Sequence, residues 1–137
     1  MTVALCIDDR GGMLFNKRRQ SRDRVLVEEL VRFAESEGAR ILISPFSKLL
    51  FENFPNAVQI DDRFLENAEL GDICFVENLQ LASFKDRIER IILYRWNRAY
   101  PGDMFFDIKL DRSWHLASAE DFAGSSHEKI TKEIYVK

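Results

Sequence analysis

The densest group of chemically active side chains lies near the start of the chain. Eight consecutive residues carry five cations and one carboxylate, so their net charge is +4 (five minus one) in a chain of net charge −3. The segment reads Lys17-Arg18-Arg19-Gln20-Ser21-Arg22-Asp23-Arg24. It precedes a predicted helix whose first amide groups also favour negative charge, so it is typical of a site for a phosphate or carboxylate ligand. The alternative is a solvated loop whose cations pair with surface carboxylates such as Glu28 and Glu29.

Asp23 is the candidate catalytic residue of this segment. In a cleft, its carboxylate could accept two parallel N–H donors from an amino-pyrimidine or guanidine-like edge. In the first turn of a helix, it would instead stabilise the helix dipole by about 0.3–1 kcal/mol. A neighbouring Arg22 or Arg24 would lower its pKa, which disfavours a role as proton donor at neutral pH. Both roles remain open from the sequence.

A second pattern, at residues 94–100, alternates aromatic and cationic side chains. Such a pattern is typical of platforms on which single-stranded nucleic acid stacks. It equally fits a strand leaving a sheet, with Tyr94 and Trp96 on one face and Arg95 on the other. Because the chain as a whole is acidic, we expect no broad contact with a phosphate backbone, and nucleic acid is an unlikely partner.

The cysteines and histidines do not form a recognisable reactive or metal-binding pattern. Cys6 and Cys74 each lie in an apolar stretch, which predicts reduced, buried thiols. His115 and His127 have no second ligand at metal-binding spacing, so we expect no metal site.

Two further polar groups are predicted to be structural. Ser126 and His127 are adjacent, and neighbouring residues on one short segment cannot normally align a nucleophile with its base. The aspartates before turns show no recognised metal-ligand spacing and are predicted to be hydrated turn residues. These are Asp8, Asp9, Asp61, Asp62 and Asp103.

Apolar periodicity predicts the elements that position these residues. Residues 25–34 keep apolar side chains at helical spacing, Ser21 or Asp23 can cap this helix, and Gly38 follows its last turn. Predicted strands cover 2–7, 40–44, 57–60, 72–76 and 90–96, with short helical stretches at 47–52, 64–69 and 79–84. Alternation of this kind predicts an α/β fold, with a mostly parallel twisted sheet covered by helices on both faces.

The end of the chain departs from this alternation. Pro101 and Gly102 form a turn dipeptide, and residues 104–108 and 130–136 are predicted strands. Lys132 shares a face with Ile130 and Ile134, which requires its side chain to extend toward solvent. We therefore predict an antiparallel C-terminal hairpin at the sheet edge.

Length and composition favour one ordinary globular domain over residues 1–137. The chain is 46% hydrophobic and 31% charged, and no apolar run is long enough to cross a bilayer. Its start lacks the basic segment of a secretion signal, so the expectation is a cytoplasmic protein with no membrane partner.

The order of these signals resembles the dihydrofolate reductase family over nearly the whole chain. Ile91–Tyr94, followed by Gly102-Asp103-Met104-Phe105-Phe106, resembles that family's strand ending in a Gly-Asp-x-x-Phe turn. Trp114 and residues 126–135 are similar to its terminal strand, and residues 8–16 with the helix start are similar to its first loop. The resemblance implies a three-layer fold in which Asp23 is the pterin-binding carboxylate.

The resemblance also implies binding residues, several of which depart from the family pattern. Arg18, Arg19 and Tyr94 take substrate positions, with Lys17-Arg18-Arg19 in place of a Leu-Pro-Trp segment. NADPH positions fall on Ser44, Ser47, Glu77 and Asn78. Here Ser44-Pro45-Phe46-Ser47 replaces a Gly-Arg-x-Thr turn, and Val76-Glu77-Asn78 replaces a Gly-Gly pair. A carboxylate and a β-branched residue cannot give the close backbone approach that two glycines allow.

Three hypotheses about function follow. The first is an NADPH-dependent reductase of a pterin or a related C=N substrate. The second is a non-catalytic binding module, in which the basic segment recognises a phosphorylated metabolite or an acidic partner. The third, less favoured, is a single-stranded nucleic-acid binder. In the first two, the expected small-molecule ligand is anionic.

Overall fold

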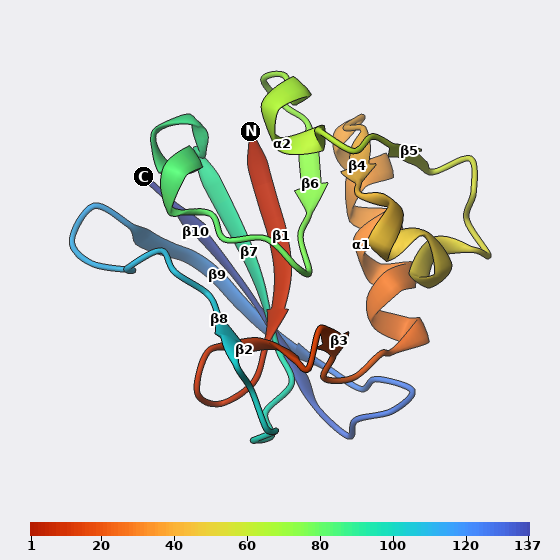
Figure 1. Ribbon diagram of the computed structural model, residues 1–137, viewed down its shortest axis with the longest axis vertical. Helices are drawn as coiled ribbons and strands as arrows, with labels where there is room; N and C mark the ends of the chain where they lie inside the picture. The colour runs from red at the N-terminus through yellow and green to blue at the C-terminus, as the bar shows by residue number, and fades with distance from the viewer.

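The computed structural model describes all residues, 1–137, and is built around a seven-stranded sheet in the order β5-β4-β6-β1-β7-β10-β9 (Figure 1). The strands are β1 (Thr2–Ile7), β4 (Ile41–Ile43), β5 (Val58–Ile60), β6 (Ile73–Phe75), β7 (Arg90–Arg95), β9 (His115–Phe122) and β10 (Ile130–Val136). The five strands β5, β4, β6, β1 and β7 pair with one another in parallel, which confirms the predicted parallel core.

The C-terminal hairpin is confirmed, but its first strand was predicted in the wrong place. β10 pairs antiparallel with both β7 and β9. The partner strand β9 covers His115–Phe122, whereas residues 104–108 contribute only the short strand β8 (Met104–Phe105) to a separate small sheet. β9 is an edge strand with mostly exposed side chains, so it has no apolar alternation for a sequence pattern to detect.

Alternate side chains of each central strand enter two different apolar layers. Along β1, Val3, Leu5 and Ile7 pack on one face with α2 (Phe64–Asn67) and with residues flanking η2 (Ala82–Arg87). Ala4 packs on the other face with α1 (Arg24–Glu37) and η1 (Pro45–Phe51). This confirms helices on both faces, although α1 alone is longer than seven residues. None of the helices combines the length and the apolar character that crossing a membrane requires.

The two ends of α1 follow from single residues. Asp23, not Ser21, is the N-cap, because its side chain accepts a hydrogen bond from the backbone N–H of Leu26 at 3.0 Å. Gly38 ends the helix at φ 64°, a left-handed conformation that glycine adopts readily. The cap places Asp23 at the carboxyl end of the sheet, beside the segment that connects β1 to α1.

That connecting segment forms a strap, residues 12–22, across the carboxyl end of β1 (Figure 1). It contains β2 (Gly12–Phe15) and β3 (Arg18–Arg19), which pair with each other, while β2 also pairs with β8. The prediction that Asp8 is a hydrated turn residue was wrong. Its carboxylate is 1% exposed and accepts the backbone N–H groups of Arg10, Gly12 and Tyr100, so it fixes the start of the strap.

Lys132 also differs from its prediction. Its ammonium group is buried rather than extended to solvent, lies 3.7 Å from the centre of the Phe33 ring and donates to Glu29 at 2.8 Å. Burial and the nearby Glu29 raise the pKa of Tyr94 well above its usual value, and its hydroxyl donates to the same carboxylate at 2.5 Å. The α1 layer therefore contains a polar cluster of Glu29, Tyr94 and Lys132.

Candidate functional site

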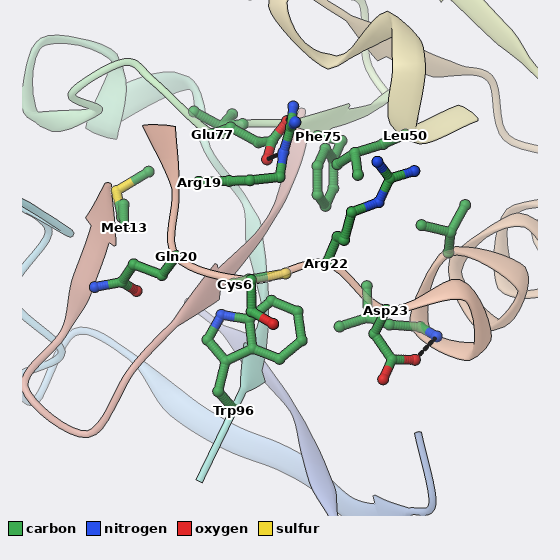
Figure 2. A pocket seen from close by; sticks show the side chains of 14 residues that line it. Cys6, Met13, Arg19, Gln20, Arg22, Asp23, Leu50, Phe75, Glu77 and Trp96 are labelled. Atoms are coloured by element: carbon green, nitrogen blue, oxygen red, sulfur yellow. Dashed lines mark hydrogen bonds and ion pairs between the residues drawn. The ribbon is translucent and has the colours of Figure 1, made fainter. Parts of the chain in front are cut away.

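A pocket lies beneath the strap at the carboxyl ends of β1, β6 and β7 (Figure 2). We call it the inner pocket. Cys6, Phe75 and Trp96 contribute from the strands, while Arg19 and Gln20 contribute from the strap. The pocket has a volume of about 20 Å³, which is room for about one water molecule. The strap is therefore closed over the pocket. After β1 the chain crosses to α1 on one face of the sheet, and after the neighbouring β6 it crosses to η2 on the opposite face. Open α/β sheets bind ligands in the crevice between two strands whose connections go to opposite faces.

The carboxylate of Asp23 borders this pocket, but protein donors already occupy it. One oxygen accepts from the Leu26 N–H, and the other accepts from the N–H and the hydroxyl of Ser126 at 2.7 and 2.8 Å. Burial acts to raise the pKa of Asp23, but hydrogen bonds from the backbone N–H groups of Ser126, Ser125 and Leu26 outweigh burial and lower the pKa to about 2. The predicted bidentate contact with a ligand would therefore require Ser126 to move away.

Ser126 and His127 extend this contact into a chain of hydrogen bonds. His127 Nδ1 lies 2.7 Å from the Ser126 hydroxyl oxygen, and His127 Nε2 lies 2.7 Å from the Tyr100 hydroxyl. Because the Ser126 hydroxyl donates to Asp23, Nδ1 of His127 must carry the proton and Nε2 must accept from Tyr100. The imidazole also stacks on Trp96, with ring centroids 4.6 Å apart.

This chain joins Asp23 to a segment that the sequence treated as a separate loop. Burial, followed by the charge of Arg98, lowers the pKa of His127, so the imidazole is neutral at neutral pH. The Ser126 hydroxyl is held between Asp23 and His127. The arrangement therefore anchors residues 124–127 over the start of α1, and Gly124 is required there because a Cβ would overlap the Asp23 carboxylate.

A second group of polar side chains lies at the edge of the inner pocket. Arg19 and Glu77 line the pocket, and Ser47 contacts Glu77 from outside it. Arg19 binds Glu77 through two nitrogens at 2.8 and 2.9 Å (Figure 2). Ser47 donates to the same carboxylate at 2.8 Å. The hydrogen bond to Glu77 raises the pKa of Arg19. Arg19, which was predicted to bind an anion, thus contacts Ser47's partner Glu77, and both Ser47 and Glu77 were predicted to bind the cofactor. Their hydrogen bonds go to one another.

The other predicted site residues lie outside the inner pocket. Tyr94 is fully buried beneath α1, and Arg18 is exposed on the strap hairpin. Ser44 precedes η1 without a side-chain capping bond, and the buried Asn78 oxygen has no hydrogen-bond partner. None of these four residues lines the pocket.

Cys6 differs from the fully buried thiol that the sequence predicted. It is half-buried and lines the inner pocket, while Cys74 is fully buried; both cysteines are free. Burial raises the pKa of Cys6 well above its usual value, and Glu77 and Asp23 raise it further. The thiol is therefore protonated and unreactive at neutral pH.

Arg22 is the cation that the pocket leaves unpaired. The protein's ion pairs include neither Arg22 nor Arg18. Arg22 also lines a cleft of about 130 Å³ between α1 and η1, which shares Asp23, Val27 and Leu50 with the inner pocket. The two hollows are therefore neighbours, and Arg22 lies at their shared border.

The residues at the expected NADPH position do not fit that cofactor as they are arranged. The Glu77 carboxylate lies there, and its negative charge opposes a pyrophosphate. The cation beside it, Arg19, is neutralised by the same carboxylate. No cluster of three or more His, Cys, Asp or Glu side chains is arranged to hold a metal ion.

Comparisons with known proteins identify the fold. No protein-family model matches the chain, and no curated protein sequence matches it. Among solved structures, the chain is similar to dihydrofolate reductase from Enterococcus faecalis complexed with NADP(H) and RAB-propyl, with a TM-score of 0.65 and 10% identity. The match covers 98% of this chain and 94% of that chain. The protein therefore has a dihydrofolate-reductase-like α/β fold.

Proposed function

We propose that the protein binds a small organic molecule that has a planar head and an anionic end. The head enters the inner pocket, and the anionic end meets Arg22 in the cleft between α1 and η1. The observation that carries this proposal is the position of Arg22, a cation without an ion-pair partner that lines both hollows. Aromatic and apolar side chains such as Phe75, Leu50 and Trp96 suit a planar head.

Binding requires the strap to move outward, because the closed inner pocket holds about one water. The ion pair between Arg19 and Glu77 is the contact that such a movement breaks. The anionic end of the ligand compensates for the lost contact by forming a new ion pair with Arg22, which a neutral ligand cannot form. Anionic ligands are therefore favoured.

Folate is a suitable probe, because it combines a planar head with an anionic tail. Trp96 lies in the pocket wall, so a titration followed by tryptophan fluorescence reports binding there. Arg22→Ala should weaken folate binding by about tenfold, the equivalent of about 1.4 kcal/mol. The matched control is Arg32→Ala, which removes an exposed arginine from α1 outside both hollows. Binding by neither folate nor dihydrofolate at millimolar concentration, or equal effects of the two variants, would contradict the proposal.

The second candidate function is hydride transfer from NADPH to a pterin or a related C=N substrate. The similar enterococcal structure, which is complexed with NADP(H), favours it. Against it stand the Glu77 carboxylate at the expected cofactor position and the occupied Asp23. Titration with NADPH, followed by cofactor fluorescence, separates the two candidates. We expect no saturable binding at millimolar NADPH; saturable binding together with oxidation of NADPH in the presence of dihydrofolate would establish the reductase instead.

A further inference from the structure

A third hollow lies between the strap hairpin and the loop after β7. We call it the outer groove, and its volume is about 540 Å³, within the range of small-molecule sites. Arg19 and Gln20 line both the outer groove and the inner pocket, so this part of the strap is a wall shared by the two hollows. The remaining residues of the groove are Phe15, Asn16, Arg18, Tyr100 and Pro101.

One wall of the groove is an exposed aromatic ring beside an arginine. Phe15 is 42% exposed, although it belongs to a strand. It lies directly opposite Arg18 in the β2–β3 register, which places the two side chains next to each other on one face of the hairpin. A flat ring and a guanidinium group together can hold a planar ligand by stacking and by charge.

The opposite wall, Tyr100–Pro101, is held in place from behind. The Tyr100 hydroxyl bonds His127, and its backbone N–H donates to the buried Asp8 carboxylate at 2.9 Å. Arg10 donates to the Tyr100 carbonyl at 2.7 Å. Because these contacts fix the wall without a ligand, little conformational freedom is lost when one binds.

The charges of the groove favour an anion. Arg18 has no ion-pair partner, and no carboxylate is among the lining residues; the neighbouring Arg19 is already paired with Glu77. Two acids bind the hairpin from outside the groove: Glu77 pairs with Arg19 at 2.8 Å, and Asp103 accepts the Asn16 backbone N–H at 3.0 Å. A ligand phosphate or carboxylate would therefore meet Arg18 without first displacing a protein carboxylate.

A third feature of the groove is the Gln20 side chain, whose amide oxygen has no hydrogen-bond partner. Gln20 donates its amide N–H to the Pro101 carbonyl at 3.2 Å, which fixes the orientation of its side chain. Its amide oxygen is buried and has no hydrogen-bond partner. Because the oxygen is buried, a ligand donor such as an amino group on an aromatic ring reaches it only after the Gln20 side chain turns toward the groove.

From these features together, we propose that the outer groove binds a mononucleotide-class ligand, an amino-bearing aromatic ring joined to an anionic group. The ring stacks on Phe15, its anion pairs with Arg18, and its amino group donates to the Gln20 oxygen once that side chain turns toward the groove. The same chemistry exists in single-stranded RNA. A free small molecule is the favoured source, because a chain of net charge −3 gives no extended basic surface for a phosphate backbone.

Calorimetric titration with adenosine monophosphate tests the proposal. Adenosine and inorganic phosphate serve as the two halves of the ligand, and the intact nucleotide should bind more tightly than either half. Phe15→Ala and Arg18→Ala should each weaken nucleotide binding by about tenfold. Matched controls are Leu70→Ala and Arg112→Ala, which remove an exposed apolar and an exposed cationic side chain elsewhere. Thermal unfolding of each variant confirms that it is folded.

The outcomes separate this site from the proposed function. Arg22→Ala should leave nucleotide binding unchanged, because Arg22 lies outside the groove. The absence of saturable binding at millimolar nucleotide overturns the proposal, as does equal binding by Phe15→Ala, Arg18→Ala and the wild type. Tighter binding of an oligoribonucleotide, with a steep dependence on salt, would identify RNA as the ligand and overturn the small-molecule assignment.

Discussion

Asp23 has two structural roles, of which the sequence predicted only the one at the helix start as an alternative to a chemical role. It caps α1 through Leu26, and it anchors the segment before β10 through Ser126. A carboxylate used in both ways must remain ionised for the fold to keep both contacts. The stability of the protein should therefore depend on the ionisation of Asp23, and hence on pH.

The pH dependence of unfolding should report Asp23 directly. Its pKa in the folded protein is lowered from 3.8 to about 2, so its ionised form stabilises the fold above pH 4. This stabilisation disappears as the pH falls through about 2, a loss of about 2 kcal/mol. Urea unfolding between pH 5 and pH 2 should show a shallower dependence for Asp23→Asn than for the wild type. Other carboxylates also titrate in this window, so the difference between the two proteins is the quantity to measure; parallel curves would refute the assignment.

Among the elements, the segment between β9 and β10 depends most strongly on one small residue. Gly124 approaches the Asp23 carboxylate so closely that any side chain would overlap it, and Gly124 also donates its N–H to the His127 carbonyl at 2.9 Å. The segment can bond Asp23 only because this position has no Cβ.

Gly124→Ala should therefore destabilise the protein by about 1–3 kcal/mol, the usual effect of overpacking a closely packed site. Chemical denaturation measures this loss, and Ala123→Ser at the exposed neighbouring position serves as the control. The imidazole should also lose its protected environment, which NMR of His127 would detect. A loss below about 0.5 kcal/mol, within the range of ordinary surface substitutions, would show that the segment relaxes without cost.

The strap is the element that the sequence could not have revealed. Its hairpin turns at Asn16 and Lys17, both with positive φ angles of 50° and 61°. Asparagine is a usual residue for such a turn, but lysine is not, so the short strands on either side resemble a loop. The same basic residues that suggested a ligand site therefore concealed a hairpin.

For the whole molecule, the sequence predicted what depends on local apolar patterns. The parallel strands and α1 follow from buried runs and helical periodicity, and the structure confirms them. β9 was missed because edge strands bury little. The pairing of Arg19 with Glu77 joins residues 58 positions apart, and that of Ser126 with Asp23 joins residues 103 positions apart. No local pattern encodes such distant partners. The sequence therefore named Glu28, which pairs with Arg24, but not Glu77, which pairs with Arg19.

The shared wall of Arg19 and Gln20 also sets a thermodynamic constraint on the protein. If occupancy of one hollow shifts these two residues, the affinity of the other hollow changes, and linkage requires the same factor in both directions. Measuring either ligand's dissociation constant with the other at saturation would then give one coupling free energy. Ligand binding in the two hollows would then be coupled through the strap.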